Sequence, residues 1–341
     1  DHRELWLFKE RSIEVFDDTG AANFPFERNP AGFIEQGIIA AASPVRLDNT
    51  VFWLGGDERG AGVVWRAQGY TPSRVSNHSM ETAIQSYPTI TDAEFWGYQQ
   101  DGHSFLVCHF PSAFPTPMGG VRGATWVYDC AASAMIGAPQ WHERAYWDPI
   151  HAVWMMHRGR CHAYCFGKHL IGDWLAGKIY ELNPKYRQDD QNPLRWLRSA
   201  PHLSDEMKLV FYDELLIDMD VGEGLANDIP VVNTQTSPET AVGINDTIAE
   251  INAHIAAGPQ PVTIGSAGSD PKVILRWSND GAKTWVKQRL LSAGKIGEYL
   301  RRVRKTRMGQ ARTRTYELSG SDPVPVAIVG AYLKTTPGNG S

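Results

Sequence analysis

Basic side chains are concentrated between residues 301 and 314, where they could bind phosphate groups or carboxylates. The set comprises Arg301, Arg302, Arg304, Lys305, Arg307, Arg312 and Arg314. An arginine fork matches two phosphate oxygens, and neutralising DNA phosphates releases their counterions. The pattern therefore suggests contact with DNA phosphates or with an acidic partner. The alternative, a solvated strand face paired with carboxylates, stays open.

These basic residues lie on predicted strands, so their side chains should alternate between two faces. Arg302 and Arg304 are expected on one face, and Arg312 and Arg314 are again expected to share a face. The face opposite Arg302 would carry Arg301, Val303, Lys305 and Arg307. Charge on both faces argues against a simply buried strand.

A turn motif precedes the basic segment. Apolar and polar residues alternate from Val273 to Trp277, and Asn279-Asp280-Gly281 then favours a chain reversal. The spacing resembles the Asp-box of propellers such as sialidases, in which an Asp caps the turn and a Trp packs beneath it. The matching residues are Ser278, Asp280, Thr284 and Trp285. Ala282 stands where that motif usually has Gly.

Two clusters invite a metal interpretation. Cys161, His162 and Cys165 suggest zinc, with His151, His157 and His169 nearby, but on a strand the cysteines and His162 point to opposite faces. Small buried cysteines are therefore favoured. Asp218, Asp220 and Glu223 resemble part of a calcium loop, but a solvated turn is favoured because the further ligands of such a loop are missing. We expect neither a metal nor any other cofactor.

Catalytic signatures do not emerge from the sequence. No P-loop, dinucleotide fingerprint or G-x-S-x-G is present. A sialidase-type site would need three arginines, a Tyr nucleophile backed by a Glu, and an Asp, which are common residue types without an ordered arrangement here. Tryptophans could stack on sugars, but most lie within strand patterns where sheet packing explains them. These are Trp6, Trp53, Trp65, Trp96 and Trp154.

Hairpins with aromatic strands recur along the first half of the chain. The predicted strand pairs are 5–8 with 12–16, 51–54 with 63–67, 93–98 with 104–110, and 151–156 with 161–166. Further strands are expected at 125–129, 178–182 and 207–218. The turns recur about every 45 to 60 residues, which is typical of β-propeller blades. A set of β-sandwiches is the alternative.

We therefore predict an all-β protein, a β-propeller with an irregular, partly helical insertion. Residues 1–220 would form propeller blades, and residues 271–341 would complete the propeller. Residues 221–270 would form the insertion, with a helix at 244–256 whose isoleucines follow helical spacing. That helix would contact a neighbouring subunit or pack on its own blade, and the two readings are equally favoured.

Composition fits a globular protein and leaves the function class open. The chain has 341 residues, 42% of them hydrophobic, with twelve tryptophans and a formal charge of −5. The mild charge means that any nucleic-acid contact must come from a local patch. No apolar run approaches the roughly 18 residues that cross a bilayer, and no signal peptide opens the chain. Four cysteines in a chain this long favour a reduced, intracellular folding environment.

Several long segments of the sequence resemble the tail hub, or packaged-DNA stabilisation, proteins of short-tailed bacteriophages. They are ELWLFKERSIEVFDDTG from Glu4, FPFERNPAGFIEQG from Phe24, TVFWLGGDERGAGVVWRAQGYTPSRVS from Thr50 and YQQDGHSFLVCHFP from Tyr98. The stretch from Val273 to Tyr332 resembles the C-terminal end of the same family. Because members carry additional sequence before this point, and because no Met opens the chain, we expect a chain trimmed at its start.

The resemblance implies a structural virion protein without enzymatic activity. Such a protein would form a ring, expected to be sixfold, between the portal-adaptor ring and the distal needle and spikes or fibres. It would retain packaged DNA, line the exit channel and contact the genome non-specifically, after assembly in the host cytoplasm. The alternative function is a sialidase-like glycan-active or glycan-binding propeller.

Overall fold

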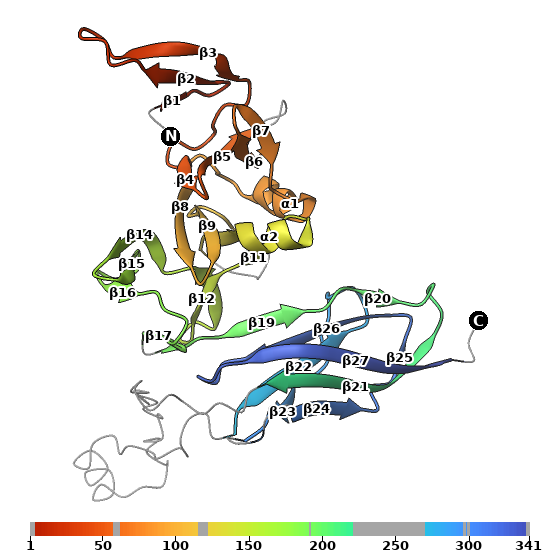
Figure 1. The fold of residues 1–341 in the computed structure, drawn as a ribbon. Coiled ribbons are helices and arrows are strands. Elements are labelled where there is room, and N and C mark those ends of the chain that lie inside the picture. The colour runs from red at the N-terminus through yellow and green to blue at the C-terminus, as the bar shows by residue number, and fades with distance from the viewer. Residues whose placement is uncertain are drawn as a thin grey trace, which may run out of the picture. The chain divides into compact units, whose positions relative to one another are not determined.

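Strands account for most of the ordered elements of this protein, as Figure 1 shows. The computed structural model describes residues 4–56, 62–114, 122–190, 192–220, 270–295, 298 and 301–338. The chain divides into an N-terminal unit, Asp1–Asn183, and a C-terminal unit, Pro184–Ser341. The predicted insertion at 221–270, including its helix, and Glu223 lie almost wholly outside the described residues, as does most of the Gly-rich turn at 55–62.

Antiparallel sheets whose strands follow one another in the chain build the N-terminal unit. The first sheet contains β1 (Glu4–Phe8), β2 (Ile13–Asp18) and β3 (Phe26–Ile34). The second contains β4 (Val45–Leu47), β5 (Thr50–Gly56), β6 (Gly62–Gln68) and β7 (Thr71–Arg74). The third contains β8 (Glu94–Gln100), β9 (His103–Phe110), β10 (Ala124–Asp129) and β11 (Trp141–Glu143). Two of these sheets are four-stranded meanders, the usual form of a propeller blade.

Two smaller sheets follow. One pairs β12 (Ala145–Asp148) with β13 (Val153–Met156), and the other contains β14 (Gly159–Cys165), β15 (Lys168–Asp173) and β16 (Ile179–Glu181). The predicted hairpin around Arg158-Gly159 is therefore wrong, because the strands on its two sides belong to different sheets. The chain reverses instead at Phe166-Gly167, where both residues have positive φ.

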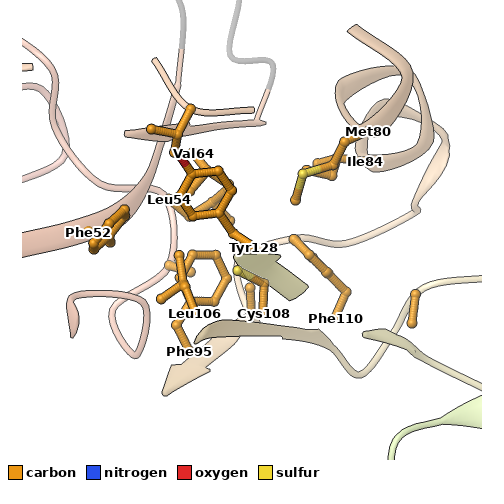
Figure 2. Packing of buried hydrophobic residues seen from close by; sticks show 14 of the residues in the cluster. Phe52, Leu54, Val64, Met80, Ile84, Phe95, Leu106, Cys108, Phe110 and Tyr128 are labelled. Atoms are coloured by element: carbon orange, nitrogen blue, oxygen red, sulfur yellow. The ribbon is translucent and has the colours of Figure 1, made fainter. Parts of the chain in front are cut away.

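Apolar side chains pack successive sheets against each other. Ile13 and Ile34 of the first sheet lie in one cluster with Val51 and Trp53 of the second. The second and third sheets share the largest cluster of this unit, and Trp96 and Val107 of the third sheet cluster with Ile171 of β15. Figure 2 shows the largest cluster, with Phe52, Leu54, Val64, Met80, Ile84, Phe95, Leu106, Cys108, Phe110 and Tyr128 labelled. These four sheets thus each bury apolar side chains that they could not bury alone.

Two short helices were not predicted from the sequence. Helix α1 spans His78–Ser86 and begins after Asn77, whose side chain accepts a hydrogen bond from the Met80 amide. Helix α2 spans Cys130–Ile136 and ends at Gly137 in the left-handed conformation. N-cap residues and a C-terminal glycine are recognisable helix signals. Both helices are shorter than the segments for which periodicity is informative.

The C-terminal unit contains two larger sheets and the short pair β17 (Gln188–Asp189) and β18 (Asn192–Pro193). One sheet has the order β19 (Trp196–Ser199), β26 (Thr313–Gly320), β22 (Lys272–Ser278) and β23 (Arg289–Ser292), and β20 (Leu203–Ser204) also pairs with β26. In the other, β21 (Val210–Asp220) pairs with β24 (Arg301–Thr306), β25 (Gln310–Ala311) and β27 (Ala327–Pro337).

The division between the units lies at residue 183, earlier than the expected boundary at 220. Strands β19 to β21 pair with strands that lie about a hundred residues later in the chain. Val210, Leu215 and Met219 accordingly share a core with Val273 and Leu318. A local hairpin pattern cannot reveal such long-range pairing, which explains the difference.

Candidate interaction sites

The Asp-box-like turn lies at the end of β22. The Asp280 carboxylate accepts hydrogen bonds from the backbone amides of Lys283 at 3.0 Å and Thr284 at 2.9 Å. Ser278 donates its hydroxyl to the same carboxylate at 2.6 Å and accepts the Ala282 amide at 3.0 Å. The side chain of Asp280 therefore replaces the backbone partners that the turn itself lacks.

Hydrogen bonds from Ser278 and then from Thr284 hold the pKa of Asp280 well below its usual range, because they stabilise the ionised carboxylate. Trp285 is half-buried, and the guanidinium of Arg276 lies 4.4 Å from its ring centroid. Ala282 adopts a φ of 69°, the left-handed conformation for which the Asp-box normally has Gly. The turn is thus a charged loop, held by its own hydrogen bonds, at one end of the sheet.

Arg314 lies in the core of the C-terminal unit, with 1% of its surface exposed. Its guanidinium lies 3.9 Å from the ring centroid of Tyr212 and 5.7 Å from that of Trp277. Its Nε donates to the side chain of Asn279 at 2.9 Å. Arg312, which was expected to share a face with Arg314, precedes β26, is exposed and donates to the Met207 carbonyl at 2.7 Å. Arg314 fastens the Asp-box-like turn to β26.

Strand β24 alternates between an exposed charged face and a face that enters the core at Val303, whereas the sequence suggested charge on both faces. Arg302 and Arg304 are exposed, whereas Val303 is 3% exposed and packs in the core. Arg302 pairs with Asp218 at 3.1 Å, and Arg304 pairs with Glu214. Both carboxylates lie on the neighbouring strand β21. The charges of these two arginines are thus matched by carboxylates, as in the alternative reading of the sequence.

The other predicted basic residues are dispersed. Lys305 is partly buried, and Arg307 is exposed at a turn where its φ is 56°. The side chain of Arg301 lies outside the described part of the chain. The structure therefore brings Arg302 and Arg304 together on one face, whereas Arg314 lies in the core.

The zinc interpretation finds no support in the geometry. Cys161 is exposed and Cys165 is partly exposed, in contrast to the expected burial, and both are free thiols. His162 instead meets His169 across the β14–β15 pair, with Nε2 and Nδ1 3.0 Å apart. Within the described residues, no group of three or more potential ligands could hold a metal ion. Asp218 and Asp220 lie on strand β21 rather than in a turn.

A Tyr–Glu pair, the arrangement that a sialidase nucleophile would need, does occur in the N-terminal unit. The hydroxyl of Tyr70 donates to Glu4 at 2.5 Å. This hydrogen bond raises the pKa of Tyr70 to about 12. A higher pKa keeps the phenol protonated at neutral pH, which is the opposite of what an activated nucleophile requires.

Two buried polar networks were missed by the sequence analysis. His109 is fully buried on β9, accepts a hydrogen bond from Trp96 Nε1 at 2.9 Å, and lies 2.8 Å from Thr125 Oγ1. Arg158 is 6% exposed and donates to Asp173 at 2.5 Å. For His109 the available signal was a histidine inside an apolar strand pattern, but the pattern does not identify its partner; Arg158 stood at a predicted turn and gave no such signal.

The histidine network has a defined tautomer. The indole nitrogen of Trp96 can only donate a hydrogen bond, so His109 Nε2 must be the acceptor and carry no proton. The neutral ring therefore carries its proton on Nδ1, which donates a hydrogen bond to Thr125 Oγ1. Burial lowers the pKa of His109 to about 4. Thr125 Oγ1 also accepts the backbone amide of His157 at 3.1 Å, so the network joins β9 and β10 to the segment that precedes β14.

Comparison with known proteins gives two family matches. Residues 1–187 match a family model described as bacteriophage P22 Gp10, beta-propeller, and residues 260–336 match one described as bacteriophage P22 Gp10, beta-sandwich. The first match confirms the predicted fold class. The second description differs from the expectation that residues 271–341 complete the propeller, and it corresponds to the sandwich alternative for that segment.

Other comparisons add little. No curated protein matches the chain. A solved structure of a glycoside hydrolase family 43 arabinoxylan arabinofuranohydrolase from Bacillus subtilis, in complex with cellotetraose, has 8% sequence identity and a TM-score of 0.18. That alignment covers 95% of this chain and 57% of the hydrolase chain. In the described residues, neither helix has the length and hydropathy needed to cross a membrane.

Proposed function

This chain belongs to the bacteriophage P22 Gp10 family, and from that premise we propose that it forms the hub, or nozzle, of a short phage tail. It is a structural component of the virion tail and not an enzyme. In the proposed role, several copies form a ring, expected to contain six. The ring lies between the portal-adaptor ring and the distal needle and spikes or fibres, retains packaged DNA and surrounds its exit channel.

The observation that carries the proposal is the pair of matches to one family, one over the N-terminal unit and one over the later part of the C-terminal unit. The site geometry is consistent with a mechanical role. The polar groups of the Asp-box-like turn bond to their own backbone, and the arginines of β24 bond to carboxylates of β21. Such contacts fix the shape of a surface and leave no obvious reactive group.

Contact with DNA in the channel would be non-specific, and we assign it to exposed residues of the basic segment. Arg302, Arg304, Arg307 and Arg312 are exposed, but the first two already have carboxylate partners. The remaining attraction between these arginines and DNA phosphates should therefore be weak, and it should fall steeply as the salt concentration rises. This weak attraction suits a channel through which DNA must slide.

The mass of the native particle tests the proposal. The purified chain would be examined by light scattering alone and after mixing with the portal-adaptor ring of its own phage. A ring of several copies, alone or on the adaptor, is the expected result. A chain that stays monomeric and does not bind the adaptor ring would refute the hub assignment.

A further inference from the structure

Side chains rather than a hydrogen-bonded ladder join the β14–β16 sheet to the third sheet, because β14 and β8 belong to different sheets. Glu94 of β8 accepts two hydrogen bonds from Arg160, of which the one from Nε is 2.5 Å long. The indole ring of Trp96 stacks on the ring of His162, with centroids 5.4 Å apart and planes 9° apart. The ring of Tyr98 lies 5.7 Å from that of His162. The contact between the two sheets thus includes a histidine, the side chain whose ordinary pKa lies near neutral pH.

His162 is hydrogen-bonded to a second histidine. Its Nε2 lies 3.0 Å from Nδ1 of His169 on β15, and both rings are half-buried. One ring must donate and the other must accept, and the pair can do so when it is neutral or when it holds one additional proton. A second additional proton leaves two donors facing each other and places two positive charges side by side. Burial, and then the neighbouring His169, accordingly lower the pKa of His162 below its ordinary value.

The carboxylates near this pair already have cationic partners. Glu94 is bound by Arg160, and Glu181 lies 2.8 Å from the ammonium group of Lys168. The hydrogen bond from Arg160 lowers the pKa of Glu94, so this ion pair persists while the histidines titrate. Neither carboxylate is therefore free to balance a second imidazolium.

The basic groups around the pair oppose additional charge. Arg144 donates to the Tyr98 hydroxyl at 2.6 Å, so a cation already lies beside the aromatic ring that contacts both histidines. His109 accepts a hydrogen bond from Trp96, and the ring of His157 lies 6.4 Å from that of His109. Burial lowers the pKa of His109 to about 4 and that of His157 to about 3, so neither takes up a proton before the pair does.

We propose that His162 and His169 form a pH-sensitive contact that holds the β14–β16 sheet on the third sheet at neutral pH and favours its release when both rings are protonated. The inference goes beyond the proposed function and concerns the N-terminal unit alone. Protonation replaces one hydrogen bond by repulsion at a contact between two sheets, which is the local event that such switches use.

The direction of the effect follows from the number of bound protons. A released sheet leaves both histidines in water, where each takes up a proton near pH 6.5, whereas the docked pair holds one proton fewer. The docked state is therefore fully favoured above pH 6.5, and its advantage declines as the pH falls below that value. A difference of one proton changes the ratio of docked to released sheet by about tenfold per pH unit.

His169→Gln tests the proposal, because Gln can still form a hydrogen bond to His162 but takes up no proton. Hydrogen exchange of the β14 and β15 amides in the full chain, corrected for the intrinsic pH dependence of exchange, reports how often this sheet opens. Opening should increase about tenfold between pH 6.5 and 5.5 in the wild type and stay nearly constant in His169→Gln. His78→Gln, on the exposed first residue of α1, is the matched control and should follow the wild type.

His109→Gln distinguishes release of this sheet from unfolding of the whole unit. Release leaves the third sheet folded, so the β14 and β15 profile should be the same in His109→Gln as in the wild type. A profile that changes with His109→Gln would show that these amides exchange only by unfolding of the unit, and it would overturn the proposal. Parallel profiles for the wild type and His169→Gln would overturn it equally.

The wild-type chain provides a second measurement that does not depend on the folding of a variant. The ring protons of His162 and His169, followed by NMR, should titrate in two coupled steps, with the second well below the first. Two independent titrations near pH 6.5 would refute the proposal. None of these outcomes bears on the hub function, which the mass of the native particle tests separately.

Discussion

Acid should weaken the N-terminal unit through His109. The neutral ring of His109 is hydrogen-bonded to Trp96 and Thr125. A second proton on the ring would lie on Nε2, where it would break the hydrogen bond that Nε2 accepts from Trp96. The pKa of His109 falls from its ordinary value of 6.5 to about 4, because burial disfavours the charged imidazole. Above pH 6.5 both the folded and the unfolded chain hold this histidine neutral. As the pH falls from 6.5 towards 4, only the unfolded chain gains the proton.

The magnitude follows from the two pKa values. A difference of about 2.5 pH units, at about 1.4 kcal/mol each, is about 3 kcal/mol of stability. This contribution is fully present above pH 6.5, declines through the window between 6.5 and 4, and changes no further below it. Burial raises the pKa of Glu143 to about 7, which acts in the opposite direction, because its protonated form is favoured on folding. The test must therefore isolate His109 from the other groups.

His109→Gln provides that isolation. The Gln side-chain oxygen can still accept a hydrogen bond from Trp96, but the residue no longer titrates. The variant should therefore be less stable than the wild type at pH 7.5. Between pH 6.5 and 4 its free energy of unfolding should fall by about 3 kcal/mol less than that of the wild type. Hydrogen exchange of the β9 and β10 amides reports this unit separately from the C-terminal one. His78→Gln, on the exposed first residue of α1, is the matched control. Parallel pH profiles for wild type and His109→Gln would refute the reasoning.

Two further substitutions test the other polar networks. Arg158→Met should destabilise the N-terminal unit by about 3–5 kcal/mol, because it leaves Asp173 buried without its cation. Urea unfolding measures this loss, and the double variant with Asp173→Asn should recover part of it. Equal stability of the single and double variants would contradict this account. Asp280→Ala should lower the melting temperature of the C-terminal unit, because the amides of Lys283 and Thr284 lose their acceptor, whereas Asp280→Asn should retain part of the turn. An unchanged melting temperature in Asp280→Ala would show that the loop is held by other contacts.

Local patterns in the sequence were sufficient for the early hairpins. Strands β1 and β2, β5 and β6, and β8 and β9 were all predicted, because each is a short run rich in apolar and aromatic residues and the two strands of each pair follow closely in the chain. The strand pair around Arg158-Gly159 was wrong for the same reason. Two adjacent strand patterns separated by a glycine look like a hairpin even when each pairs elsewhere.

Long-range pairing was not accessible to this approach. Nothing in β21 indicates that its partners are β24 and β27, because a strand pattern shows which face is apolar but not which strand lies alongside. The helices α1 and α2 were missed although Asn77 and Asp129 cap them, since each spans fewer than ten residues. Recognition of the family, by contrast, needed only several long sequence segments that resemble the family and occur in the same order.

Arg314 and Phe166 show why the candidate sites could be predicted only in part. Each residue contradicts the usual chemistry of its place, an arginine in a strand core and a phenylalanine at an exposed turn. Arg314 has an internal explanation, because Tyr212, Trp277 and Asn279 surround its guanidinium. Phe166 is 93% exposed and so has no comparable burial within its own chain. The sequence alone shows neither anomaly, because Phe166 was expected at the end of a strand, and only burial in the structure separates a residue that completes its own fold from one that remains exposed.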